Sequence, residues 1–368
     1  MSRLLLLLPG DPKALDAGAK IRNAGLLRLL ASDHEVDTLV FGSPPRRSTV
    51  RRAADILRSP WPDMAWRLWS PAFAARVRQQ GYSAVQAEGI EMARYLSVVP
   101  REKRIYDAHN AEFLLQRRVS LTAASLAGAA YSRIQWRRLE RFERTIVRNS
   151  RLSLAVSQHD ANQLLALGGP GVDVRVIPNG IDAAAYPFIS ASQKAPGFEL
   201  LFLAKMDFRP NAEALRWFLD HVFPSLPAVR LFAVGSRPPR WLVAAGQHND
   251  RIAVTGYVDD ERRYLARTHV LVLPLQTGGG SRLKALVAMA SGLPIVSTRL
   301  GMEGLDVEPG VHFLPADTAA EWVASLRRLM AEPALRVGLA TAGRQLIEQR
   351  YDWSALRQAV RAAYDWLP

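Results

Sequence analysis

The sequence of 368 residues contains no cysteine. This absence excludes disulfide bonds, thiolate nucleophiles and cysteine-based metal sites at once, and it permits a reducing cytoplasm. Long hydrophobic runs are scarce as well. The leucines at residues 4–8 are stopped by Pro9 and Gly10, so the run is too short for a bilayer span or the core of a signal peptide. We interpret these leucines as a buried first strand.

Acidic residues are outnumbered, with 34 aspartates and glutamates against 48 lysines and arginines. The formal net charge is therefore +14. Most of the basic residues are arginines, which favour phosphates, carboxylates and anionic surfaces. No nucleic-acid-binding module is recognisable, so we expect no nucleic acid partner. An anionic membrane surface, a phosphate-rich substrate and ordinary solvated charged faces are all compatible with this charge.

Apolar, β-branched runs alternate with stretches of helical period, which is the pattern of an α/β protein with parallel sheets. Strands are predicted at residues 3–8, 35–41, 84–87, 104–107, 152–156 and 174–177, and again at 199–204, 229–234, 252–255, 270–274 and 295–297. Each half of the chain is therefore expected to form a Rossmann-like domain. At this length we expect two domains with a cleft between them.

A polar stretch at residues 190–197 separates the two halves, which places the linker near residues 183–197. We predict an N-terminal domain at residues 1–185, a C-terminal domain at 186–351 and a final helix at 352–368. The final helix carries its apolar residues on one face. We therefore expect it to pack back on the N-terminal domain.

The sharpest local signal follows the strand at residues 270–274. Three glycines at 278–280 precede an apolar helix whose first turn carries Ser281, Arg282 and Lys284. Glycines let the backbone approach an anion closely, and a helix N-terminus offers unpaired N–H groups and the positive end of its dipole. The arrangement is typical of a diphosphate-binding loop, although it matches neither the P-loop nor the GxGxxG pattern. A flexible loop capped by Ser281 is the alternative.

This helix and its exit, residues 281–298, resemble the donor-binding region of glycosyltransferase family 4, the group 1 glycosyltransferases. Segments 176–182, 202–211, 255–259 and 301–305 resemble the same family in the same order. The resemblance implies the GT-B fold, in which a Rossmann-like domain on the acceptor side and a second one that binds the nucleotide sugar face a central cleft. It also implies retaining transfer, without metal or other cofactor, from a nucleotide diphosphate sugar to a hydroxyl group. A glycan, a lipid-linked compound or a small molecule would be the acceptor, as in a bacterial subgroup that acts on cell-surface glycans.

The roles of individual residues follow from the same resemblance. Lys205 and Arg209 fall at or near cationic positions on the donor diphosphate, and His109 follows a strand in a loop that resembles the family's histidine-bearing loop. These three form the predicted catalytic set. The two cations would contact the diphosphate, and the family's histidine contacts the donor sugar near the reacting carbon. The predicted donor-binding residues are Gly18, Gly256, Tyr257, Gly279, Gly280, Ser281, Arg282, Leu283, Lys284 and Glu303, and the predicted acceptor-binding residues are Lys20, Arg22 and Asn110.

One departure from the family pattern concerns the ribose of the donor. Many relatives carry two glutamates in this region, and the corresponding residues here are Gly279 and Val287. Valine offers no acceptor to the ribose hydroxyls that the second glutamate usually binds. Glu303 is the nearest substitute, with a helix cap or a surface loop as its alternative role.

Two other functions remain open on the same architecture. A degenerate protein would bind a nucleotide sugar without turnover, which Val287 favours, and a nucleotide-sugar epimerase would need pairs of carboxylates for acid/base chemistry. Membrane anchoring is a further function, because arginines beside aromatic residues suit a lipid headgroup layer. The residues concerned are Arg46, Arg47, Arg51, Arg52, Trp61, Trp66, Arg67 and Trp69. We expect a cytoplasmic protein, peripheral on the inner membrane face if these residues bind lipid.

Overall fold

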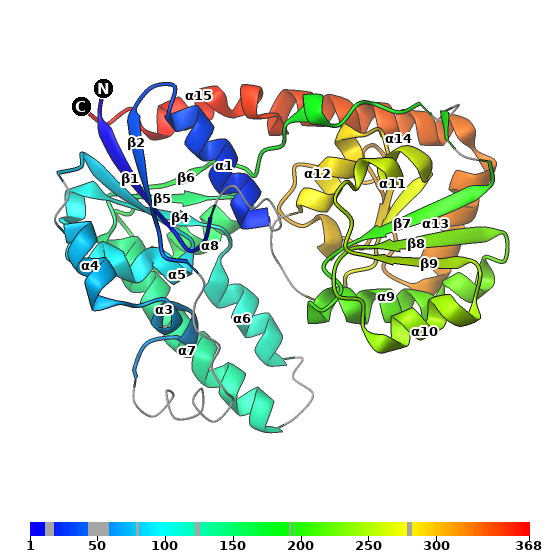
Figure 1. The fold of residues 1–368 in the computed structure, drawn as a ribbon, viewed down its shortest axis with the longest axis horizontal. Coiled ribbons are helices and arrows are strands. Elements are labelled where there is room, and N and C mark those ends of the chain that lie inside the picture. Colours follow the sequence, from blue (N-terminus) through cyan, green and yellow to red (C-terminus); the bar gives the residue numbers. More distant parts are fainter. Residues whose placement is uncertain are drawn as a thin grey trace. The chain divides into compact units, whose positions relative to one another are not determined.

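The computed structural model of the chain describes residues 1–11, 18–42, 59–78, 81–121, 126–190, 193–194, 196–277 and 282–368. These residues form two compact units, each built on one sheet (Figure 1). The first unit comprises Met1–Gly180 and Leu356–Pro368, and the second comprises residues 181–277 and 282–355.

The first unit holds a six-stranded parallel sheet in the order β2-β1-β3-β4-β5-β6. The strands are β1 (Arg3–Leu8), β2 (Glu35–Val40), β3 (Ala84–Glu88), β4 (Arg104–Ala108), β5 (Leu152–Ala155) and β6 (Val174–Val176). All six strands predicted in this half are present, with ends that differ by no more than a residue. Residues 4–8 are almost wholly buried, because β1 lies inside the sheet and is covered on both faces.

Helices cover both faces of the first sheet (Figure 1). They are α1 (Gly18–Leu30), α3 (Asp63–Arg67), α4 (Pro71–Arg78), α5 (Ile90–Ala93), α6 (Glu112–Leu121), α7 (Leu126–Asn149) and α8 (Gln158–Gly168), with 3-10 turns η1 (Arg94–Val98) and η2 (Arg101–Lys103). The last helix, α15 (Trp353–Ala363), corresponds to the predicted tail helix. Leu356, Val360 and Tyr364 are buried, and this end of the chain belongs to the first unit.

The second unit holds another six-stranded parallel sheet, in the order β12-β11-β10-β7-β8-β9. The strands are β7 (Phe198–Leu203), β8 (Val229–Val234), β9 (Ile252–Gly256), β10 (Val270–Leu273), β11 (Ile295–Ser297) and β12 (Leu314–Pro315). Five of them were predicted from the sequence. The sixth, β12, has only two residues, too few for any periodic pattern to reveal it.

The helices of the second unit alternate with its strands. They are α9 (Arg209–His221), α10 (Arg240–His248), α11 (Arg262–Arg267), α12 (Leu283–Ala290), α13 (Ala319–Ala331) and α14 (Pro333–Leu346), with 3-10 turns η3 (Ala183–Ala185), η5 (Phe223–Ser225) and η6 (Leu300–Met302) and a π-helical turn η7 (Ile347–Tyr351). Helix α13 begins with a capping box, in which Thr318 and Glu321 satisfy each other's backbone N–H groups.

The chain enters the second unit at Ile181, slightly before the predicted linker. Two contacts tie this entry to the end of the unit. Ile181 forms a parallel bridge with Asp352, and the Asp352 carboxylate accepts a hydrogen bond of 2.9 Å from the backbone N–H of Ala183. These partners are far away in sequence, so the composition of the polar stretch did not reveal them.

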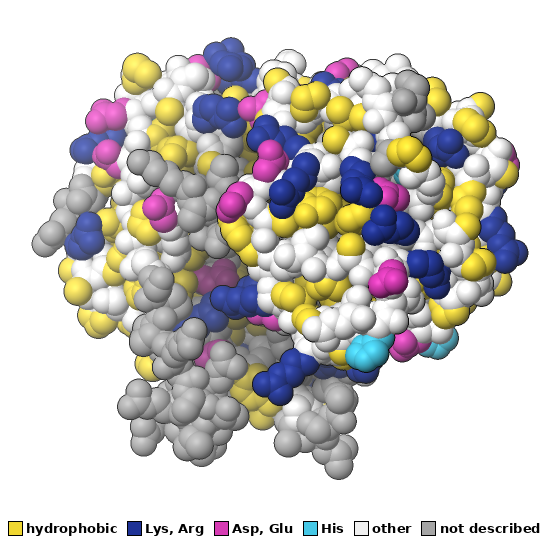
Figure 2. Space-filling model, turned by 45° about the vertical axis from the view of Figure 1, so that its right-hand side comes forward, with side chains coloured by type: hydrophobic (Ala, Val, Ile, Leu, Met, Phe, Trp, Pro, Cys, Tyr) yellow, Lys and Arg dark blue, Asp and Glu magenta, His cyan; other side chains and the backbone are white. Residues whose placement is uncertain are grey.

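Surface charge is mixed on the face drawn in Figure 2, where lysine and arginine side chains lie among acidic and hydrophobic ones. Several exposed arginines are paired with carboxylates, including Arg262 with Asp260 and Arg299 with Asp317. Such exposed pairs contribute little to stability. No helix among the described residues is long and apolar enough to cross a membrane.

Candidate donor and sugar sites

The strand order of the second sheet reverses direction at β7, because the chain builds β7, β8 and β9 to one side and then returns to place β10 on the other. At such a switch point the loops after two neighbouring parallel strands diverge, and open α/β sheets bind ligands there, at the carboxyl ends of the strands. The loop after β7 carries Lys205 and leads to α9. The loop after β10 leads to α12, which carries Lys284.

A short chain of hydrogen bonds joins these two loops. The Lys284 ammonium donates to Oδ1 of Asn211 over 3.0 Å, and Nδ2 of Asn211 donates to the Lys205 carbonyl over 2.9 Å. Asn211 is buried at the start of α9 and fixes both partners. The structure therefore links the Lys284 ammonium to the backbone of Lys205, so these two residues of the predicted donor site lie on adjoining loops.

Burial disfavours the charged form of Lys284, and the nearby Arg282 guanidinium repels it. Together they lower the pKa of Lys284 to about 8. A carboxylate partner would have opposed this shift, but the side chain has the neutral amide of Asn211 instead. An incoming anion would favour the charged ammonium, so the site is chemically suited to a diphosphate.

Lys205 and Arg209 are more exposed than Lys284. The Lys205 side chain is 58% exposed, and its ammonium lies 3.9 Å from the Asp207 carboxylate. Arg209, the first residue of α9, pairs with Glu213 over 2.6 Å. A ligand at this edge would find Lys205 accessible, whereas Arg209 would have to exchange its present partner.

Two glycines shape the neighbouring strand ends. A Cβ atom on Gly235, after β8, would lie 1.8 Å from the Ala204 carbonyl oxygen, so only glycine permits this approach of β8 to β7. Gly256 ends β9 with φ of +69°, and a Cβ atom there would meet nothing within 4 Å. The adjacent Tyr257, with 70% of its surface exposed, is available for contact with a ligand.

The remaining predicted donor residues divide into two groups. Arg282 is buried, and its guanidinium donates to the Leu300 carbonyl of η6 over 2.8 Å. Leu283 is also buried, as the first residue of α12, while the half-buried Glu303 follows η6. Gly279, Gly280 and Ser281 lie outside the described residues. Arg282 thus holds η6, the turn that precedes Glu303. Because its side chain is buried, it supports this turn and does not present an exposed charge.

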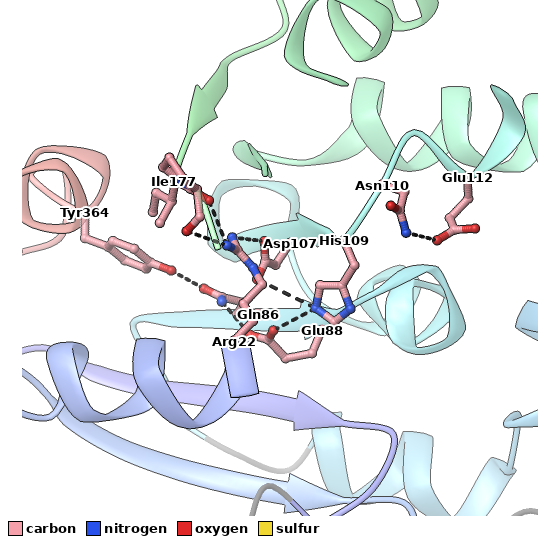
Figure 3. A network of polar contacts seen from close by, with 10 residues as sticks. Arg22, Gln86, Glu88, Asp107, His109, Asn110, Glu112, Ile177 and Tyr364 are labelled. Atoms are coloured by element: carbon pink, nitrogen blue, oxygen red, sulfur yellow. Dashed lines mark hydrogen bonds and ion pairs between the residues drawn. The ribbon is translucent and has the colours of Figure 1, made fainter. Parts of the chain in front are cut away.

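His109 lies at the carboxyl edge of the first sheet, directly after β4, in a group of buried polar side chains (Figure 3). Its Nε2 atom is 3.3 Å from Oε2 of Glu88 and 3.9 Å from Oδ2 of Asp107. Glu88 ends β3, the strand beside β4. Sequence reasoning missed Glu88, although a carboxylate at the end of an apolar strand was a usable signal.

Arg22 corrects one prediction. The side chain is 1% exposed, and its Nε and Nη2 atoms donate to the two Asp107 oxygens over 2.9 and 2.7 Å. Its Nη1 atom donates to the Ile177 and Pro178 carbonyls. Arg22 therefore neutralises Asp107 inside the first unit and presents no charge to an acceptor. Gly18 is the first residue of α1, and the side chain of Lys20 lies outside the described part of the chain.

The carboxylates around His109 titrate unusually. Burial, together with the charge of Asp107, raises the pKa of Glu88 to about 7. Burial also opposes ionisation of Asp107, but the Arg22 guanidinium outweighs it and holds the pKa of Asp107 below its usual value. Burial likewise opposes protonation of His109, yet the Glu88 hydrogen bond and the Asp107 charge raise its pKa.

Glu88, Asp107 and His109 offer three potential metal ligands within 4.8 Å of one another. Two of these ligands already have partners that disfavour a metal ion. The Arg22 guanidinium neutralises the Asp107 carboxylate, and Gln86 donates a hydrogen bond of 2.6 Å to Glu88. We interpret the group as a hydrogen-bonded network around His109.

The loop after His109 is held by a second buried carboxylate. Glu143 of α7 accepts hydrogen bonds from the Tyr106 hydroxyl and from the backbone N–H of Phe113, over 2.8 and 3.0 Å. Asn110, a predicted acceptor residue, donates to Glu112 over 2.8 Å. These contacts anchor the start of α6 and orient the segment that follows His109.

The predicted membrane region is only partly described. Arg46, Arg47, Arg51 and Arg52 lie outside the described residues. The three tryptophans, Trp61, Trp66 and Trp69, surround the Arg94 guanidinium at 4.7, 5.4 and 4.0 Å from their ring centres. Their rings therefore bind a cation of the same unit.

Known proteins of similar structure share this architecture. Sucrose-phosphate synthase of Thermosynechococcus elongatus matches with a TM-score of 0.76 and 19% identity, over 99% of this chain and 98% of that one. Anabaena HepE, solved in complex with UDP-glucose, matches with a TM-score of 0.63 and 16% identity, over 99% and 100%. The two parallel sheets and these likenesses define the GT-B class of glycosyltransferase folds.

Sequence comparison gives the family. A model described as Glycosyltransferase Family 4 matches residues 18–185, and one described as Glycosyl transferases group 1 matches residues 197–332. The chain belongs to this family of group 1 glycosyltransferases. Glycogen synthase of Mycobacterium tuberculosis is 27% identical over 238 residues, which cover 62% of this chain and 57% of that protein. The match thus spans little more than half the length of this curated relative.

Proposed function

We propose that this protein transfers a sugar from a nucleotide diphosphate donor to a hydroxyl acceptor, with retention of configuration and without a metal. The observation that carries the proposal is the Lys284–Asn211–Lys205 cluster at the switch point of the second sheet. Family membership of both halves and the UDP-glucose bound by Anabaena HepE support a nucleotide sugar as the ligand.

The cluster would act on the leaving group. As the bond from the anomeric carbon to the diphosphate oxygen breaks, negative charge develops on that oxygen, and fixed cations stabilise it most when water is excluded. Lys284 and Lys205 supply this charge. The acceptor oxygen bonds to the anomeric carbon on the face that the diphosphate leaves, and the acceptor proton passes to the departing phosphate oxygen. No protein nucleophile takes part.

We assign His109 to the donor sugar, as the family resemblance implies. Glu88 and Asp107 hold its ring from one side, so an imidazole in a defined orientation is available to the sugar. Asn110 remains the proposed acceptor residue of this segment, while Arg22 is assigned to structure alone.

A glycan or a lipid-linked hydroxyl compound is our proposed acceptor, handled in the cytoplasm beside an anionic membrane. Arg133, Arg137 and Arg141 favour the membrane, because they are exposed and recur every four residues along one side of α7. Sedimentation with anionic liposomes should show binding at low salt that is lost at high salt. Equal sedimentation with neutral liposomes would contradict this assignment.

A thermal-shift screen of nucleotide sugars tests the donor, since a ligand of the folded state raises the melting temperature. The donor found in this way is then incubated with hydroxyl acceptors, and the anomeric configuration of the product is read by NMR. Turnover that persists in a chelator would support transfer without a metal. An inverted product, or dependence on a divalent cation, would refute that part of the proposal.

One observation favours a degenerate binding protein as the second candidate. Val287 is 7% exposed within the apolar α12, so it offers neither a hydrogen bond nor space to the donor ribose. Binding of a nucleotide sugar with neither transfer nor hydrolysis would select this candidate.

A further inference from the structure

A continuous chain of buried side chains leads from the C-terminal segment to His109 (Figure 3). The Tyr364 hydroxyl, just beyond α15, donates to Oε1 of Gln86, and Nε2 of Gln86 donates to Oε1 of Glu88 over 2.6 Å. The other Glu88 oxygen lies 3.3 Å from Nε2 of His109. Tyr364, Gln86 and Glu88 are each 2% exposed or less, so this part of the chain is shielded from water.

The hydrogen bonds in this chain run from the tyrosine toward Glu88. A glutamine amide can present either its oxygen or its N–H₂ group to a neighbour. Because Tyr364 donates a proton to the amide oxygen, Gln86 turns its N–H₂ group toward Glu88. A donor in that position favours the ionised form of Glu88, and an ionised Glu88 in turn favours a proton on His109.

Other charges around Glu88 act in both directions. Asp107 opposes its ionisation, whereas His109 favours it. Arg22 offsets Asp107 by pairing with both of its oxygens. Burial and Asp107 together outweigh His109 and raise the pKa of Glu88 to about 7, so its two protonation states are close to balance at neutral pH. One neutral hydrogen bond is enough to shift such a balance.

We propose that Tyr364 is a positioning residue for His109, and that it acts through Gln86 to keep an ionised Glu88 against the imidazole. The inference rests on the proposed function only in so far as His109 serves sugar transfer. Tyr364 itself touches neither donor nor acceptor. Its effect on the imidazole is a property of the first unit and can be measured without a substrate.

The substitution Tyr364→Phe removes the hydroxyl and leaves the ring. The Gln86 amide is then free to turn its oxygen toward Glu88, which favours a protonated carboxyl group. His109 loses its anionic partner and should release its proton more easily. From the usual strength of a hydrogen bond to a charged group, we expect the pKa of His109 to fall by about one unit.

The experiment is a titration of the histidine ring signals by NMR in the full-length protein. The chain has 7 histidines, and the His109 signal is assigned from its loss in His109→Gln. Tyr82→Phe is the matched control, because Tyr82 also lies in the first unit and donates its hydroxyl to a carboxylate, that of Asp37, over 2.8 Å. A fall of about one unit in Tyr364→Phe with no change in Tyr82→Phe is the expected result.

An unchanged His109 titration in folded Tyr364→Phe would overturn the proposal. If that variant does not fold, Gln86→Met removes the donor to Glu88 and must give the same fall. In the transfer assay, the limb of the kcat/KM profile that reports His109 should move toward acid by about one unit, with the donor KM within about twofold. A moved titration with an unmoved profile would overturn the positioning role in transfer. Absence of transfer in the unsubstituted protein would refute only the proposed function, because the titration still decides the inference.

Discussion

Replacing Lys284 with methionine should stabilise the ligand-free protein and at the same time weaken its binding of the donor. Methionine keeps the length of the side chain and its contact with apolar neighbours but carries no charge. In the folded protein the pKa of Lys284 is lowered from 10.5 to about 8 by burial and by Arg282. The charged ammonium is therefore less stable in the folded state than in the unfolded chain.

The shift sets an upper limit of about 3 kcal/mol on this destabilisation at neutral pH. Because the side chain is only half-buried, we expect a gain of about 1 to 2 kcal/mol in the free energy of unfolding of Lys284→Met at pH 7. The penalty is fully present below pH 8. It decreases as the pH rises from 8 toward 10.5, because the folded protein then releases the proton that the unfolded chain still holds. The two proteins should therefore approach equal stability at alkaline pH.

The donor should respond in the opposite direction. Loss of one cation from the diphosphate site should weaken binding by about tenfold to a hundredfold. In the unsubstituted protein, donor affinity should also decline above about pH 8, as Lys284 loses its proton. Urea denaturation and isothermal titration calorimetry, each at pH 7 and 9, measure the two effects.

Two other lysines serve as controls. Lys194 also has a pKa lowered to about 8 by burial, but its ammonium donates to the Leu265 carbonyl. Lys194→Met should change stability without changing donor affinity. Lys205 is 58% exposed, so Lys205→Met should weaken the donor and leave stability within about 0.5 kcal/mol. If Lys284→Met destabilises the protein, or binds the donor as before, the assignment of Lys284 is wrong.

Four further substitutions test the site and the strand ends beside it. Lys205→Ala should lower turnover by about tenfold to a thousandfold, because a cation on the leaving group contributes most in the transition state; the melting temperature should not fall, because the side chain is 58% exposed. Glu303→Gln should raise the donor dissociation constant about tenfold if Glu303 binds the ribose, and a change below about twofold would place the ribose elsewhere. Val287→Glu should destabilise the protein instead of tightening the donor, because the site is 7% exposed and would bury a charge. Gly235→Ala should lower the free energy of unfolding by about 2 kcal/mol or more, because the new methyl group collides with the Ala204 carbonyl; denaturation midpoints measure both of these losses.

The positions of candidate site residues in the fold could be predicted where the signal was local. Lys205, Lys284 and His109 each follow or precede a strand whose apolar pattern is plain in the sequence, so their place at the carboxyl edge of a sheet could be predicted. Arg22 was misassigned, because its partner Asp107 lies 85 residues away and no local pattern links them. Glu88 was missed as well, although it is a carboxylate at the end of an apolar strand.

The sequence by itself determined the local elements of this protein. Runs of apolar residues defined the strands, because strand preferences act within a few residues. Only the tertiary structure decided which elements meet. The order of strands places β10 beside β7 and so brings Lys284 to Asn211, 73 residues away, and the return of α15 brings Tyr364 to Gln86, 278 residues away. Such contacts depend on how complete layers bury their faces against one another, which no short stretch of sequence encodes.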